Sequence, residues 1–152
     1  MPPIMTKVAL NTLTVLTAIG AGLIPVTCCA YPLDAQLDCK SNAHAFIAPL
    51  LNAQYIDPKP MRVEVNSVNA FRPTHDSNLT AFGFRVYAVL GYERDDTIFK
   101  QGSGQPITPS AYGAVVLGPA EAVEARAREA GSDAVVRQVV PLLLTAIFCS
   151  EH

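Results

Sequence analysis

The stretch from Leu79 to Tyr92 constrains the fold of this chain more than any other. Its even-numbered positions form a nearly unbroken apolar series, made of Phe82, Phe84, Val86, Ala88, Leu90 and Tyr92. The odd-numbered positions between them are mixed. Strict alternation of this kind, rich in aromatic and β-branched side chains, indicates a long strand with one face on a core. We therefore predict a sheet organised around this strand.

The first thirty residues have the layout of a secretory signal peptide. Lys7 is their only charged residue, an apolar run follows from Val8 to Val26, and the small residues Cys28 and Ala30 precede a cleavage point before Tyr31. A transmembrane anchor is the main alternative, but polar and small residues dilute the run. Lipid modification of Cys28 or Cys29 is another, although Thr27 and Cys28 stand where Gly or Ala is usual. The remaining residues, 31–152, are enough for one domain with a single core.

Two cysteines, Cys39 and Cys149, survive removal of this leader, one near each end of the mature chain. In an oxidising compartment such a pair is expected to form a disulfide. Free thiols or a metal pair are the alternatives, and no nearby His or further Cys supports a metal. We predict that the bond pins the first helix to the last strand.

The remaining elements follow from apolar spacing and from Gly and Pro positions. We predict a helix over Cys39 to Gln54 kinked or shortened by Pro49, a strand over Met61 to Val65 followed by a bulge near Asn66 and Ser67, a small edge strand at Thr97 to Phe99, a strand over Ala111 to Leu117, and a helix over Ala120 to Ala130.

The C-terminal part carries one ambiguity and one clear pattern. Residues 133–140 predict a second short helix, although their four valines also permit a strand. Leu142 to Cys149 is apolar at both even and odd positions, which is typical of a strand buried on both faces. A parallel crossover would join this strand to Ala111–Leu117. The predicted fold is an α+β two-layer sandwich, in which a mixed four- to five-stranded sheet carries an N-terminal helix and a β-α(-α)-β C-terminal unit.

Catalytic motifs are weak in this sequence. His75, Asp76 and Ser77 have the residue types of a hydrolytic triad, but neighbours in one polar loop point in different directions. The chain contains three His and no HExxH or CxxC motif, so we predict no metal and no cofactor. The predicted alternative to a binding protein is a small secreted hydrolase that uses His75 with an acidic partner, Asp76 or Asp95.

Surface composition points instead to binding. Arg85 and Tyr87 lie between small residues on the odd face of the long strand, and the Gly- and Pro-rich loop from Gln101 to Pro109 has no hydrophobic period. The candidate binding residues are Arg85, Tyr87, Arg94, Asp95, Asp96, Gln101, Ser103, Gln105 and Tyr112. With Lys7 removed, ten basic residues face thirteen acidic ones, and no basic stripe suits nucleic acid.

These observations favour an exported, non-catalytic protein in the periplasm or the secreted fraction. An inhibitor, or an immunity protein that neutralises a toxin or enzyme of the envelope, fits a small disulfide-tied domain with a protruding loop. A structural envelope protein is the remaining alternative. A membrane would be involved only through an uncleaved leader.

Mass spectrometry of the exported protein tests the leader and the disulfide together. We expect an N-terminus at Tyr31 and a mass two hydrogens below that of the reduced chain. Residues retained before Tyr31 would contradict cleavage, and two alkylatable thiols would contradict the bond.

Overall fold

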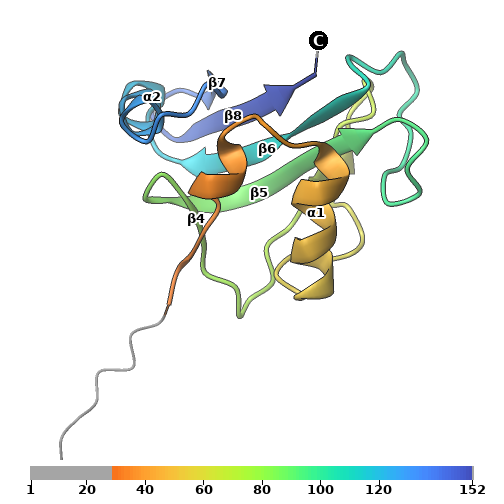
Figure 1. Ribbon diagram of the computed structural model, residues 1–152, viewed down its shortest axis with the longest axis horizontal. Coiled ribbons are helices and arrows are strands. Elements are labelled where there is room, and N and C mark those ends of the chain that lie inside the picture. Colours follow the sequence, from red (N-terminus) through yellow and green to blue (C-terminus); the bar gives the residue numbers. More distant parts are fainter. Residues whose placement is uncertain (1–28, 152) are drawn as a thin grey trace, which may run out of the picture.

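The computed structural model describes residues 29–151 and confirms an α+β fold in which two α-helices pack on a mixed eight-stranded sheet (Figure 1). The elements, in chain order, are β1 (Tyr31–Pro32), the 3-10 helix η1 (Asp34–Leu37), α1 (Ala43–Asn52), β2 (Arg62–Val63), β3 (Asn69–Phe71), β4 (Leu79–Ala81), β5 (Phe84–Glu93), β6 (Ser110–Leu117), α2 (Ala120–Glu129), β7 (Val135–Val140) and β8 (Leu144–Ser150). Residues 1–28 of the predicted leader lie outside the described residues.

The main path of the sheet runs β1-β4-β5-β6-β8-β7, and β3 pairs with both β2 and β5. Among the strand pairs of the described residues, the short β1–β4 pair is parallel and the others are antiparallel. The sheet has more strands than the four or five predicted, because several are only two or three residues long. The predicted parallel crossover is wrong: β6 and β8 are antiparallel neighbours, paired from Ala111↔Ser150 to Leu117↔Leu144.

The predicted long strand is a hairpin. Phe82 and Gly83 both have positive φ, of 51° and 86°, and form a two-residue turn between β4 and β5. Two positive φ values in succession are typical of the turn whose twist matches an antiparallel pair. The alternation continues in β5 until Tyr87, an extra residue that faces no partner in β6. This bulge shifts the apolar parity, so that Val89 is fully buried.

The two faces of the sheet are covered unequally. Val89, Ala114 and Ile147 lie side by side on β5, β6 and β8, and each has no exposed surface. Helix α1 packs over this covered face. Its Ile47 side chain lies so close to Gly91 of β5 that a Cβ on this glycine would collide with it. Helix α2 contacts β7 and β8. Its Val123 and Ala127 join the same core.

The opposite face, here called the open face, carries no helix formed by residues 29–151. Its side chains alternate with the buried ones along β8, where Leu144, Ala146, Phe148 and Ser150 are each only half-buried. The prediction that this strand is buried on both faces is therefore wrong. Among the described residues, only the odd-numbered positions of β8, such as Ile147, are fully covered.

Within residues 133–140, Val135–Val140 form the edge strand β7, which settles the ambiguity left by the valines. β7 pairs with β8 on one side and with no strand on the other among residues 29–151. The hairpin joining them places Leu142 at φ 60° in its turn, with Leu143 N–H donating to Val140 O. The predicted second helix is wrong, because β-branched side chains pair well across a sheet.

Three smaller predictions also need correction. Helix α1 begins later than predicted, since Cys39 has a φ of 62° and cannot be helical, and Pro49 lies inside the helix. The predicted bulge at Asn66 and Ser67 is a tight turn between β2 and β3, closed by Glu64 N–H donating to Val68 O. Residues 97–99 form a turn rather than a strand.

The predicted disulfide between Cys39 and Cys149 is present, with the two Cα atoms 5.1 Å apart. It joins the segment before α1 to β8, across a sequence separation of 110 residues. A disulfide that ties two distant parts of a fold together indicates an oxidising compartment.

Breaking this bond should lower the free energy of unfolding by about 4 to 5 kcal/mol, because the unfolded chain regains the entropy of a long closed loop. Urea unfolding of the oxidised protein and of the Cys39→Ser/Cys149→Ser variant measures the difference. Reductant should destabilise the parent protein and leave the variant unchanged. An equal urea midpoint for the two proteins would contradict this role.

Candidate binding surfaces

A large, mainly apolar hollow lies on the open face and is here called the apolar groove. It has a volume of about 650 Å³ and receives residues from β5, β6, β7, β8 and two flanking loops. Its lining consists of Glu64, Asn66, Val68, Leu90, Ile107, Thr108, Pro109, Ala111, Tyr112, Val115, Val139, Ala146, Phe148, Ser150 and Glu151. The only two charged side chains among them, those of Glu64 and Glu151, are both acidic.

The floor of the groove follows from the strand register. Leu90 pairs with Gly113, and Gly113 pairs with Phe148, so a residue without a side chain lies between two large ones. A Cβ on Gly113 would collide with the Ile147 carbonyl oxygen. The absence of this side chain leaves the middle of the open face hollow.

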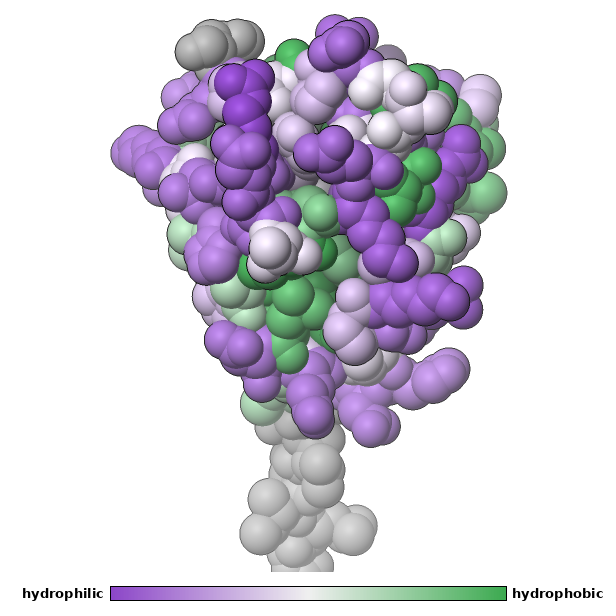
Figure 2. Space-filling view, turned by 90° about the vertical axis from the view of Figure 1, so that its right-hand side faces the viewer, coloured by the Kyte–Doolittle hydropathy of each residue, from purple (hydrophilic) through white to green (hydrophobic). Residues whose placement is uncertain are grey.

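Apolar surface also lies exposed at the rim and along β7. Ile107 is 64% exposed and Val139 is 52% exposed. At the tip of the β7–β8 hairpin, Leu142 is 83% exposed. Figure 2 shows the side of the molecule toward which the 94–109 loop extends, where apolar side chains reach the surface between hydrophilic ones. Clustered apolar exposure of this kind marks interaction sites on soluble proteins.

The candidate residues Arg85 and Tyr87 lie together in a second pocket, of about 310 Å³, with Arg72 and His75. Here Tyr87 is the bulged residue of β5 and is 52% exposed. These two side chains do not share a pocket with the 101–109 loop. Arg85 stands at the start of β5, and the loop comes after the end of that strand at Glu93.

The other candidate residues lie beyond the far end of β5. Asp95, Asp96 and Gln101 line a hollow of about 240 Å³, while Arg94, Ser103 and Gln105 are exposed nearby. Two sets of hydrogen bonds hold the loop. The side-chain amide of buried Asn69 donates to Lys100 O and accepts the Lys100 N–H, and Gly104 N–H donates to Val65 O. These bonds fix the loop beside the apolar groove.

Tyr112, also predicted as a binding residue, is only 2% exposed. Its ring packs against Phe46 with centroids 5.0 Å apart, and its hydroxyl oxygen accepts the Ser41 N–H at 3.2 Å. The side chain therefore ties α1 and its preceding segment to β6 and belongs to the core. Alternation alone could not show which face of this strand the helix covers.

The triad-like residues of the 73–78 loop do not assemble. His75 and Asp76 are both exposed, and within residues 29–151 neither side chain forms a hydrogen bond or an ion pair. Ser77 Oγ donates to Thr74 O instead. This arrangement stabilises a turn and supplies no base-to-nucleophile contact, which a hydrolase would need.

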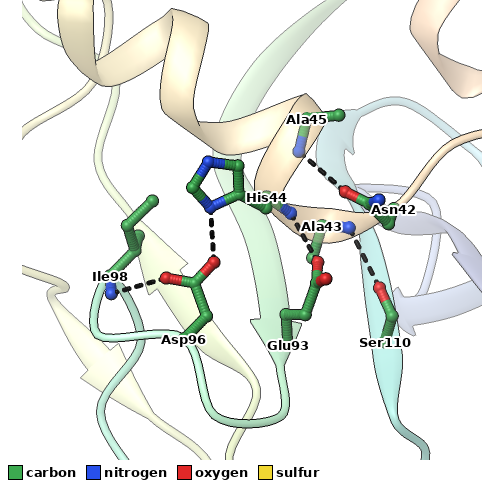
Figure 3. A network of polar contacts seen from close by, with 8 residues as sticks. All are labelled: Asn42, Ala43, His44, Ala45, Glu93, Asp96, Ile98 and Ser110. Carbon is green, nitrogen blue, oxygen red and sulfur yellow. Dashed lines mark hydrogen bonds and ion pairs between the residues drawn. The ribbon is translucent and has the colours of Figure 1, made fainter.

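A second set of Ser, His and Asp side chains does come together, at the N-terminus of α1 (Figure 3). His44 Nδ1 lies 2.5 Å from Asp96 Oδ2, and the Asp96 carboxylate also accepts the Ile98 N–H. Ser110 Oγ, however, accepts the Ala43 N–H, and the second ring nitrogen of His44 points away from it. These residues therefore lack the relay of a catalytic triad.

The same cluster accounts for the first N–H groups of α1, which have no partners within the helix. Ser110 Oγ accepts the Ala43 N–H, Glu93 Oε2 accepts the His44 N–H at 2.7 Å, and Asn42 Oδ1 accepts the Ala45 N–H at 2.8 Å. Carboxylates at a helix N-terminus are also favoured by the helix dipole. We assign this cluster to anchoring α1 on the ends of β5 and β6.

Sequence reasoning missed the groove residues Leu90, Val115 and Phe148. The sequence did carry a signal for this surface. Leu142–Cys149 is apolar at even and odd positions, but the predicted amphipathic helices supply apolar side chains for one face of a sheet. Within residues 29–151, no group of three or more His, Cys, Asp or Glu is arranged to hold a metal, and no helix is long and apolar enough to cross a bilayer.

No protein-family model matches this chain, and neither a curated protein nor a solved structure is significantly similar to it.

Burial raises the pKa of the Tyr112 phenol above its ordinary value, and the Ser41 N–H acts in the opposite direction. Because the folded state holds this proton more tightly, its contribution to stability is full below the unfolded pKa, about 10, and is lost as the pH rises through the folded value. Urea unfolding should therefore show stability falling above about pH 10.

The variant Tyr112→Phe should lose part of this alkaline decline, whereas Tyr87→Phe, which changes an exposed phenol, should keep it. An alkaline decline of equal steepness in all three proteins would show that Tyr112 does not contribute.

Proposed function

We propose that this chain is an exported, non-catalytic binding protein, a periplasmic inhibitor or toxin-immunity protein that acts by surface complementarity. One observation carries the proposal: the apolar groove on the open face of the sheet. In the part of the chain that the structure describes, helices cover only one face of a sheet whose central strands are apolar on both faces. The second face is suited to a partner.

The chemistry of the groove describes that partner. Half-buried Leu90, Val115 and Phe148 offer apolar contacts, and large apolar or aromatic side chains dominate the energetics of interfaces. Glu151, which forms no ion pair within residues 29–151, favours a partner segment that carries Lys or Arg beside its apolar residues, whereas the Glu64 carboxylate is already paired with Arg62. The mildly acidic balance of the mature chain acts in the same direction at longer range.

Rigidity supports the proposal as well. The groove is built on paired strands, and its loop is tied to the Glu64–Val68 turn by Gly102 and Gly104. The disulfide further restrains the end of β8. A preformed surface loses little conformational entropy on binding, which suits an inhibitor.

The two other functions considered from the sequence have less support. A hydrolase that uses His75 lacks a carboxylate contact to that ring. A structural envelope protein would also expose apolar surface, but a defined apolar groove that is also lined by Glu151 favours a defined partner.

Affinity capture from envelope extract, with the exported protein as bait, would identify the partner by mass spectrometry, and calorimetry with the purified partner would measure the dissociation constant. We expect Phe148→Ala to weaken binding by about tenfold or more, as for a residue at the centre of an interface, and Ile107→Ser, at the rim, to weaken it by less. Ile107 is exposed, so its replacement should leave the melting temperature unchanged.

Tyr87→Ala is the matched control, since it removes an exposed aromatic ring outside the groove. Weakening by Tyr87→Ala but not by the groove variants would move the interface to the Arg85 surface. Failure to find any saturable partner would favour a structural role.

A further inference from the structure

A gap in the sheet lies between β3 and β4, on one side of β5. β3 pairs with Val89, Leu90 and Gly91, whereas β4 pairs with Phe84 and Arg85. Neither strand reaches the intervening residues 86–88, which include the bulged Tyr87. The 72–78 segment connects β3 to β4 around this gap, and the pocket of about 310 Å³ lies here.

Three potentially cationic side chains line this pocket. Arg72 and His75 come from the connecting segment, and Arg85 comes from β5. The segment is fixed to residues 54–57, because Asp57 N–H donates to Arg72 O at 2.8 Å and Thr74 N–H donates to Tyr55 O at 3.0 Å. A fold that holds these side chains around one hollow brings like charges together.

No acidic residue lines the pocket to balance them. Across residues 29–151, ion pairs join only His44 to Asp96, Arg62 to Glu64 and Arg128 to Glu124. The guanidinium groups of Arg72 and Arg85 thus keep all their donors available, and such groups bind the oxygens of phosphate in a two-point geometry.

The rest of the lining is mixed. Thr74 and Ser77 are polar, while the half-exposed ring of Tyr87 and the partly exposed side chain of Leu117 offer apolar contact. A ligand with an aromatic or apolar group next to its anion would contact both parts of the lining.

We propose that this pocket is a binding site for a small phosphate monoester with an attached apolar or aromatic group. Arg72 and Arg85 bind the phosphate oxygens, His75 adds a third donor, and Tyr87 contacts the organic group. The pocket shares no residue with the apolar groove, so the site does not depend on the proposed protein partner.

Calorimetric titration of the exported protein in low-chloride buffer tests the site, with phenyl phosphate, inorganic phosphate and benzoate as probes. We expect saturable binding that is tightest for phenyl phosphate. Inorganic phosphate lacks the apolar contact, and benzoate carries a smaller charge. Raising the salt concentration should weaken binding.

The variants Arg72→Gln and Arg85→Gln should each weaken phenyl phosphate binding by at least about tenfold, since each removes charge-assisted hydrogen bonds. Arg137→Gln is the matched control, because it removes an exposed arginine from β7. Both pocket arginines are exposed, and an unchanged melting temperature would show that each variant folds.

Absence of saturable phenyl phosphate binding would overturn the proposal. Equal weakening by Arg137→Gln would do so as well, because it would reveal an effect of net charge alone. Benzoate binding as tight as phenyl phosphate would overturn the assignment to phosphate.

Discussion

Hydrophobic burial of one face of the sheet holds this protein together. Val89, Ala114 and Ile147 form the centre of that face, and α1, α2 and η1 supply the apolar side chains that cover it. Within residues 29–151 no helix covers the second face, where Leu90 and Phe148 stay half-buried around a hollow at Gly113. This imbalance connects the fold to the proposed function, since apolar strands that their own chain leaves open gain free energy when a partner covers them.

The covering layer is attached at defined points. The disulfide fixes the segment before α1 to β8, and the Tyr112 hydroxyl and Ser110 Oγ each accept a backbone N–H from the start of the helix. On the other side, Ser132 Oγ donates to Leu37 O and so joins the α2–β7 connection to η1. All of these contacts lie at the ends of helices and strands, and none of them uses a side chain of the open face.

The sequence predicted the fold class and the disulfide because both rest on local or countable signals: alternation, helix propensity and an even number of cysteines. It failed where long-range pairing decides. The Phe82–Gly83 turn interrupts an alternation that reads as continuous, and Tyr87 as a bulge reverses its parity. The valines of residues 135–140 fit the spacing of a helix as well as that of a strand, so pairing with β8 decides their structure. Of the candidate site residues, Arg85 and Tyr87 are exposed as expected, but Tyr112 is buried by a helix whose position no local pattern specifies.

The central claim is that the open face is accessible in the free protein, and methyl NMR with a soluble paramagnetic probe measures this directly. The account predicts strong relaxation enhancement for the methyl groups of Leu90, Val115 and Val139, and little for those of Val89 and Ile147 on the covered face. Equal protection of both sets in the monomer would mean that the chain covers its own open face, and would contradict the account.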